Sequence, residues 1–167
     1  MYRSFPFYIS GWWDADALHS VWGWNVVARP TPECSMSVLV VDADTIQRDS
    51  LRAILGEQYR LTFVAGLSEA LRMVREHRPD LLVSEVDLSD GTGLELCARI
   101  RELPGGRRLP IMLVTHRSST ADKVAGFQAG ADDYVVKPVD TRLFSVRLRL
   151  LFRLKGIERP RDLQAPR

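Results

Sequence analysis

Four polar residues of this chain stand at or just after the ends of apolar runs: Asp42, Glu85, Thr115 and Lys137. Two carboxylates that meet at one place could hold a hard divalent cation through their oxygens. A hydroxyl and an ammonium beside them could bind the oxygens of a phosphoryl group. Each residue alone is more often simply solvated, but four of them in this order indicate one phosphoryl-binding site.

The apolar runs that precede these residues have the length and the β-branched content of buried strands. They occupy residues 38–41, 81–83, 111–115 and 133–138. The segment 59–65 alternates apolar and polar side chains, which predicts a half-buried or edge strand. Apolar residues at helical spacing predict helices at 44–58, 67–78, 94–103, 120–130 and 140–155.

Strands that alternate with helices in this way require a parallel sheet with right-handed helical crossovers. The sequence therefore predicts an α/β fold with a five-stranded, parallel, doubly wound sheet. The carboxyl ends of parallel strands meet at one edge of the sheet, where ligands bind in open α/β folds. We expect the four polar residues to lie together at that edge.

Local signals mark the ends of three predicted helices. Asp44 or Thr45 can cap the first helix, and Ser68 is the predicted N-cap of the second. Gly130 is expected to end the fourth helix at its C-cap.

Composition limits the class of protein. The chain has 167 residues, of which 46% are hydrophobic, and its net charge of +2 is too small to indicate nucleic-acid binding. The two cysteines, Cys34 and Cys97, lack metal-ligand spacing, and we expect Cys97 to pack in the core. No apolar run approaches the roughly 18 residues of a membrane span. We expect a soluble, cytoplasmic protein.

Composition and hydrophobic periodicity divide the sequence into three parts. Residues 1–35 hold all four tryptophans without a sustained helical or strand period, and we expect a loosely ordered extension. An aromatic membrane-surface anchor, or a start codon assigned too far upstream, are the alternatives for this part. Residues 36–155 carry the alternating pattern of one domain. Residues 156–167 form a basic, proline-containing tail.

Four segments of this domain carry a family signature: VLVVDAD, PDLLVSEVDLSDGTGLEL, PIMLVT and GADDYVVKP. In order and spacing they resemble the receiver domain of bacterial two-component response regulators, and the resemblance covers about residues 36–155. It implies a flavodoxin-like (βα)5 fold. It also implies transfer of a phosphoryl group from a sensor-kinase histidine to a strand-end aspartate, with Mg²⁺ held by acids after the first strand.

The resemblance assigns a role to each site residue. Asp42 matches the first metal-binding acid, and Glu85 occupies the phosphoacceptor position. Thr115 matches the switch hydroxyl, Tyr134 the switch aromatic residue and Lys137 the conserved lysine. The family also implies a cis peptide bond directly after this lysine.

Several positions depart from the family pattern. Glu85 replaces an aspartate, and its additional methylene moves the carboxylate outward by roughly 1 Å, whereas in-line attack tolerates little misplacement. Ala43 replaces the second metal-binding acid, so we expect no cofactor unless the phosphoryl site works, in which case it needs Mg²⁺. His116 stands where a small residue is usual and could crowd the pocket. Thr92 replaces an aspartate before the third helix.

These departures predict an atypical single-domain response regulator, a pseudo-receiver of phosphorelay signalling that acts by protein–protein interaction and is not an enzyme. An ion pair between Glu85 and Lys137 could hold it in an active-like state without phosphate, or could simply stabilise the fold. Two alternatives stay open. One is a working, Mg²⁺-dependent phosphoryl acceptor, and the other is the receiver part of a transcriptional regulator without its DNA-binding domain.

The last predicted helix has more apolar residues than one buried face requires. Leu143, Val146, Leu150 and Leu154 form one stripe, while Phe144, Leu148, Leu151 and Phe152 fall elsewhere on the helix. The excess indicates a partner surface, or a helix that packs against the N-terminal extension.

The resemblance also implies partners: a sensor kinase or a downstream regulator, and a second copy of the chain. Receivers of DNA-binding regulators dimerise through the fourth helix, the last strand and the last helix. Lys123, Asp133 and Arg147 match charged positions of that face, while Leu143 replaces an acid. We expect no contact with nucleic acid.

Overall fold

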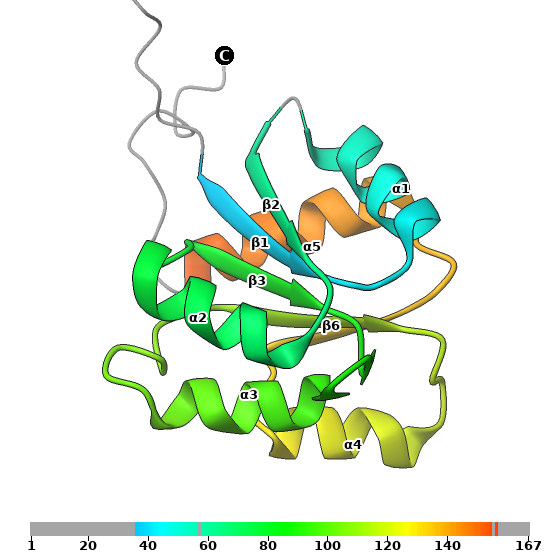
Figure 1. Cartoon of the computed structure of the whole chain (residues 1–167). Coiled ribbons are helices and arrows are strands. Elements are labelled where there is room, and N and C mark those ends of the chain that lie inside the picture. Colours follow the sequence, from blue (N-terminus) through cyan, green and yellow to red (C-terminus); the bar gives the residue numbers. More distant parts are fainter. Residues whose placement is uncertain (1–35, 57, 155, 157–167) are drawn as a thin grey trace, which may run out of the picture. The chain divides into compact units, whose positions relative to one another are not determined.

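Five parallel strands form one sheet in the order β2-β1-β3-β6-β7 (Figure 1). The strands are β1 (Ser37–Val41), β2 (Arg60–Val64), β3 (Leu81–Ser84), β6 (Ile111–Thr115) and β7 (Asp133–Val136). The structure is a computed structural model that describes residues 36–56, 58–154 and 156. The predicted parallel, doubly wound sheet is confirmed.

Helices cover both faces of this sheet, namely α1 (Thr45–Leu55), α2 (Leu67–His77), α3 (Gly93–Glu102), α4 (Thr120–Gln128) and α5 (Thr141–Leu154). Side chains of α1 and α5 pack with one face of the sheet, and side chains of α2 and α3 pack with the other. Strands β3 and β6 are buried along their whole length, which explains their continuous apolar sequence. Within the described residues no helix has the length and apolar content that crossing a membrane requires.

The structure confirms the predicted cap of α1, corrects that of α2 and shifts that of α4 by one residue. Asp44 caps α1 as expected, because its carboxylate accepts a hydrogen bond of 2.9 Å from the amide of Ile46. Ser68 does not cap α2, whose N-cap position is Gly66 and which receives no cap from its own side chains. The C-cap of α4 is Ala129, and Gly130 follows it with a φ of 103°.

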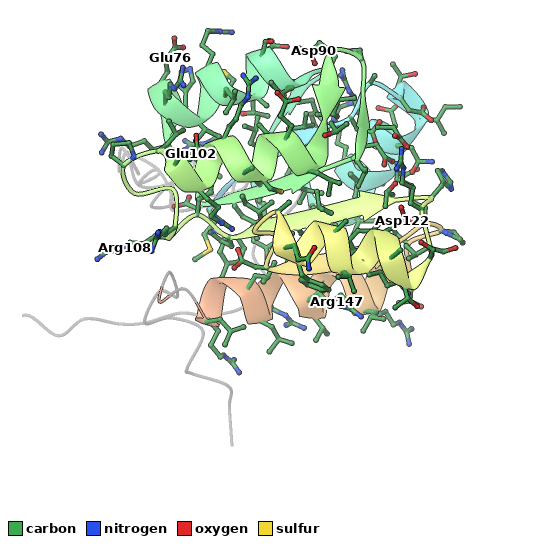
Figure 2. The ribbon with its side chains drawn as sticks, turned by 90° about the horizontal axis from the view of Figure 1, so that it is seen from below. Glu76, Asp90, Glu102, Arg108, Asp122 and Arg147 are labelled. Carbon is green, nitrogen blue, oxygen red and sulfur yellow. The ribbon has the colours of Figure 1, made fainter. Side chains whose placement is uncertain are left out.

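The cap of α2 comes from a distant part of the chain. The segment after Glu85 forms a short antiparallel ribbon of β4 (Asp87–Leu88) and β5 (Gly91–Thr92), which the sequence did not predict. At its tip Asp90 accepts hydrogen bonds from the amides of Leu67 and Ser68 (Figure 2). A Cβ atom at Gly66 would lie 2.3 Å from Asp90 Oδ1, so a larger residue there would displace this carboxylate.

Cys97 is fully buried on α3, as predicted, and burial raises the pKa of its thiol to about 12. It therefore packs in the core as a small apolar side chain. The predictions for Cys34 and for the extension 1–35 lie outside the described residues, as does nearly all of the predicted tail, 157–167.

Candidate functional site

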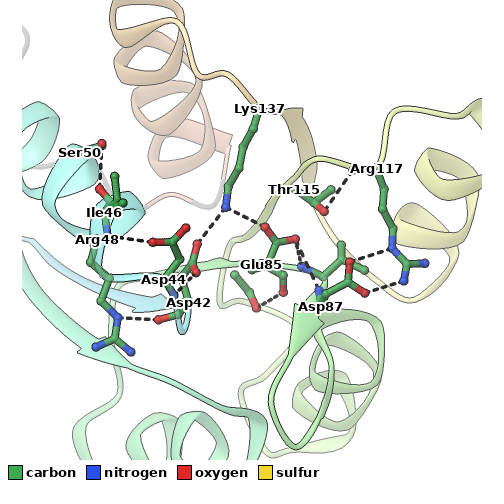
Figure 3. Close-up of polar contacts among 12 residues, drawn as sticks. Asp42, Asp44, Ile46, Arg48, Ser50, Glu85, Asp87, Thr115, Arg117 and Lys137 are labelled. Atoms are coloured by element: carbon green, nitrogen blue, oxygen red, sulfur yellow. Dashed lines mark hydrogen bonds and ion pairs between the residues drawn. The ribbon is translucent and has the colours of Figure 1, made fainter.

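The carboxyl edge of the sheet brings the four predicted polar residues together (Figure 3). Asp42 follows β1, Glu85 follows β3, Thr115 ends β6 and Lys137 follows β7. These strands are direct neighbours in the sheet, and all four side chains converge because the strands run parallel.

Lys137 lies at the centre of this group. Its ammonium donates hydrogen bonds to Glu85 Oε2 at 2.7 Å and to Asp42 Oδ2 at 2.9 Å. The side chains of Lys137, Asp42 and Glu85 are only 5%, 7% and 11% exposed. Burial lowers the pKa of Lys137, but the hydrogen bonds and charges of Glu85 and Asp42 outweigh this effect and raise the pKa above its ordinary value. The lysine is therefore a fixed cation, and the bond to Pro138 is cis as the resemblance implies.

The remaining oxygens of the two acids also accept hydrogen bonds. Asp42 Oδ1 accepts the amide of Asp44 at 2.8 Å. Glu85 Oε1 accepts the amide of Val86 at 2.7 Å and lies 3.5 Å from the amide nitrogen of Asp87. The Glu85 carboxylate is thus folded back on its own backbone at one oxygen and held by Lys137 at the other.

The described residues offer a magnesium ion two side-chain acids at this edge, one fewer than the family pattern. Only Asp42 and Glu85 converge there, since Ala43 offers no side-chain oxygen and Asp44 turns toward the start of α1. Among the described residues no cluster of three metal-ligating side chains exists. The Lys137 ammonium also stands between the two carboxylates that a cation would bridge.

Thr115 and Tyr134 hold the loop between β6 and α4. Thr115 is buried, and its hydroxyl accepts the amide of Arg117 at 3.3 Å. Tyr134 is 7% exposed, and its hydroxyl donates to the carbonyl of Arg117 at 3.1 Å. Burial raises the pKa of Tyr134, so the phenol stays a donor at neutral pH. Its ring lies so close to Gly126 that a Cβ atom there would be 2.8 Å from Tyr134 Cδ2.

Arg117 is a site residue that sequence reasoning missed. Two of its nitrogens bind both oxygens of Asp87, and Asp122 Oδ1 lies 3.8 Å from a third (Figure 3). The hydrogen bonds that Arg117 donates to Asp87 raise the pKa of Arg117. Equal offsets could have revealed this pair, because Asp87 and Arg117 each lie two residues after a strand-end residue, Glu85 and Thr115, of neighbouring strands. The predicted crowding residue, His116, is exposed to solvent.

The predicted interaction residues lie on α4, β7 and α5. Lys123 is exposed on α4. Arg147 lies on α5 (Figure 2). It donates hydrogen bonds to Asp133 Oδ1 at 2.8 Å and to Oδ2 at 3.0 Å. Asp133 also accepts its neighbour's amide, from Tyr134, at 2.8 Å. Arg147 and Asp133, two of the residues on which the dimer prediction depends, therefore form an ion pair within one chain.

Comparison with known proteins adds independent evidence. Residues 38–149 match the model of the response regulator receiver domain. The chain is 41% identical over 118 residues to the transcriptional regulatory protein AfsQ1 of Streptomyces coelicolor, covering 70% of this chain and 51% of that protein. It is 40% identical over 125 residues to the response regulator MprA of Mycobacterium ulcerans, covering 74% and 53%. The chain thus spans about half the length of the curated relatives it matches.

Solved structures show the same fold. A putative response regulator from Chloroflexus aurantiacus superimposes with a TM-score of 0.69 at 32% identity, covering 71% of this chain and 98% of that one. The receiver domain of a sensor histidine kinase from Pseudomonas aeruginosa, solved with magnesium coordinated in its active-site cleft, gives a TM-score of 0.64 at 28% identity, covering 73% and 98%. The parallel sheet, the polar residues at its carboxyl edge and these matches indicate the same family. The chain belongs to the family of response regulator receiver domains.

Proposed function

We propose that this receiver domain signals by protein–protein contact and depends little or not at all on phosphorylation. The observation that carries this proposal is the sharing of the Lys137 ammonium between Glu85 and Asp42, at 2.7 and 2.9 Å. The negative charge that a phosphoryl group would bring toward Lys137 is already supplied by the longer side chain of Glu85. The receiver thus holds its charge arrangement permanently.

The state of Glu85 also disfavours phosphoryl transfer to it. Each of its oxygens already accepts a hydrogen bond, from Lys137 and from the amide of Val86. Attack on a phosphoryl donor needs one oxygen in line with the leaving group, and these two hydrogen bonds restrict how the carboxylate can turn. A metal ion that neutralises the donor also has no acid at Ala43 to bind.

The second support is the position of Tyr134. Its ring is buried, and its hydroxyl is bound to the loop that follows Thr115. The family resemblance implies that this aromatic residue reorients together with the switch hydroxyl. In this chain the loop is also bound from the other side, through the contact between Arg117 and Asp87. We infer one fixed switch state, biased by Glu85 in the way that phosphate biases a working receiver.

Intact mass spectrometry after incubation with acetyl phosphate and Mg²⁺ tests the proposal. We expect no gain of the ~80 Da that one phosphoryl group adds. The double variant Ala43→Asp/Glu85→Asp, which restores both acids of the family pattern, is the positive control and is expected to gain it. Stoichiometric labelling of the unchanged chain would establish the alternative, a working phosphoryl acceptor with Mg²⁺.

For partners we propose a sensor kinase or a downstream regulator, and a second copy of the chain. The homodimer would use the face of α4, β7 and α5, where Lys123, Asp133 and Arg147 match the family positions. Leu143 of α5 is 52% exposed, and Val124 and Phe127 of α4 are 47% and 50% exposed. Leu143 stands where the family has an acid, and Val124 and Phe127 add apolar surface to the same face.

The curated relatives are about twice as long as the matched part of this chain. Since the S. coelicolor relative is named a transcriptional regulatory protein, a second candidate function is the receiver part of such a regulator. Mass spectrometry of the protein purified from its native source separates the two, because a larger mass than this chain's would establish the longer regulator.

A further inference from the structure

An open groove separates α1 from α5 on one face of the sheet, opposite to α2 and α3. Its volume is about 550 Å³. Ala53 and Ile54 line it from α1, and α5 contributes Thr141, Arg142, Ser145, Val146 and Arg149. Both helices pack on the same core cluster beneath the groove, so its walls are rigid elements.

The groove combines an apolar floor with a basic rim. Ile54 is half-buried and Val146 is 41% exposed, so apolar surface remains open to solvent between the helices. Arg142 and Arg149 are exposed, and among the described residues neither has a carboxylate partner. Arg147 of α5 (Thr141–Leu154) is paired with Asp133, so the charge of the rim comes from Arg142 and Arg149. The rim therefore carries uncompensated positive charge.

We propose that this groove docks an acidic amphipathic helix of a partner protein. Aliphatic side chains of that helix would enter the groove beside Val146, and its carboxylates would bind the guanidinium groups of Arg142 and Arg149. These arginines lie seven residues apart on α5, about 10.5 Å along the helix axis. Carboxylates seven residues apart on one face of a partner helix match that spacing.

Charge complementarity decides between this occupant and the others. A second copy that docks here through a two-fold axis would place the same arginines against each other, which costs energy. Nucleic acid would attract the arginines, but its phosphates offer nothing apolar for Ile54 and Val146. A membrane surface favours apolar side chains that project outward, whereas these line a concave groove. An acidic, apolar helix satisfies both parts of the surface.

This inference does not rest on the state of Glu85. The groove residues come from the middle and end of α1 and from α5. Among the described residues, none of them is hydrogen-bonded to the side chain of Asp42, Glu85 or Lys137. A working phosphoryl acceptor would carry the same groove. Failure of the phosphorylation proposal and failure of this one are therefore separate results.

Fluorescence anisotropy with two designed peptides tests the proposal on the full chain. The first probe is a labelled 15-residue peptide with leucine at three- and four-residue spacing and glutamate between. The second has lysine at every glutamate position. We expect the glutamate peptide to bind at least tenfold more tightly, and we expect added salt to weaken it.

Three variants locate the binding. The double variant Arg142→Glu/Arg149→Glu and the single variant Val146→Asp are each expected to weaken the glutamate peptide at least tenfold. All three positions are exposed, so circular dichroism should show an unchanged fold. Arg75→Glu is the matched control, because Arg75 is an exposed arginine of α2, on the opposite face of the sheet. It should bind as the unchanged chain does.

Other results would overturn the proposal. Equal affinity for both peptides would show non-specific binding without a defined site. An equal loss of affinity in Arg75→Glu and in the double variant would show the same. Self-association that only the groove variants abolish would assign the groove to a second copy. Binding of vesicles that contain an anionic lipid, without binding of the glutamate peptide, would assign it to a membrane surface.

Discussion

At the scale of single residues, the site is governed by one lysine with two acidic partners. Removing ions from water is costly, and the attraction between buried charges offsets this cost only when every ion is well paired. Lys137 meets that condition for Asp42 and Glu85 at once, since it donates to both within 2.9 Å. Loss of the lysine would leave two carboxylates buried side by side.

We predict that Lys137→Met lowers the free energy of unfolding at neutral pH by about 3–5 kcal/mol, the range for removing one partner of a buried ion pair. The folded-state pKa of Lys137 is raised, so its contribution is complete below its unfolded pKa of about 10.4 and is lost as pH rises through the folded pKa. The difference between the two proteins should therefore shrink in strongly alkaline solution. Urea denaturation at several pH values measures it.

Lys123→Met is the control for this prediction, because Lys123 is an exposed lysine of α4. It should change stability by no more than about 0.5 kcal/mol. A pH-independent difference between Lys137→Met and the unchanged chain would contradict the assigned pairing.

The role of Glu85 as a permanent charge makes a separate prediction. Glu85→Gln removes the charge but keeps the length of the side chain, and Glu85→Asp keeps the charge but withdraws it from Lys137. If Glu85 holds the signalling state, both variants should bind the partner several-fold more weakly, which titration calorimetry with the purified kinase or regulator measures. Equal affinity of all three proteins would leave the pair a purely structural role.

At the scale of elements, the sequence predicted the helix cap that a nearby residue forms, but not the contacts between residues far apart in the chain. Asp44 caps α1 as expected, because its donor lies two residues away. Ser68 was a wrong prediction, since the cap of α2 comes from Asp90, a partner 22 residues away that only the folded chain brings near. The contact of Arg117 with Asp87 was missed for the same reason, as it spans 30 residues. Periodicity shows which segments form helices, but not which side chains meet.

Asp90 fastens the β4–β5 ribbon to α2, and we predict that Asp90→Ala loosens both. The hydrogen bonds of Ser68 and Leu67 lower the pKa of Asp90, so its stabilisation is present above the unfolded pKa of about 3.9 and is lost as pH falls through the folded pKa. Amide hydrogen exchange at Leu67 and Ser68 should accelerate, and the Tm should fall at neutral pH.

Asp90→Asn should retain part of the protection, because asparagine also accepts from helix amides. Asp49→Ala is the matched control, since Asp49 is an exposed acid of α1 that binds Arg52 and caps no helix. Unchanged exchange at Leu67 and Ser68 in Asp90→Ala would exclude the fastening role.

At the scale of the whole molecule, the apolar pattern of the sequence predicted the five strands of the parallel sheet and the edge that carries the site, but not the short β4–β5 ribbon. It also indicated a surplus of apolar residues on α5. The structure buries Phe144, Leu148, Leu151 and Phe152 and leaves the other stripe exposed, with Leu154 at 78%. Sequence alone could not decide which stripe faces the core, because both have helical spacing.

The exposed stripe makes a prediction about assembly. If the face of α4, β7 and α5 forms a homodimer, sedimentation equilibrium should show association that rises with concentration, and Leu143→Asp should weaken it about tenfold or more. Ile46→Asp is the control, since Ile46 is 71% exposed on α1, away from that face. A monomer at every concentration would exclude the dimer.

The shared lysine has a consequence for how such a protein could be regulated. A receiver that is switched by a modification can change its output within one copy of the molecule. Here the balancing charges are all encoded in the chain, as Asp42, Glu85 and Lys137, so every copy leaves the ribosome with the same setting. Under the proposed function, the cell would adjust the strength of the signal through the number of molecules, which the rates of synthesis and degradation set.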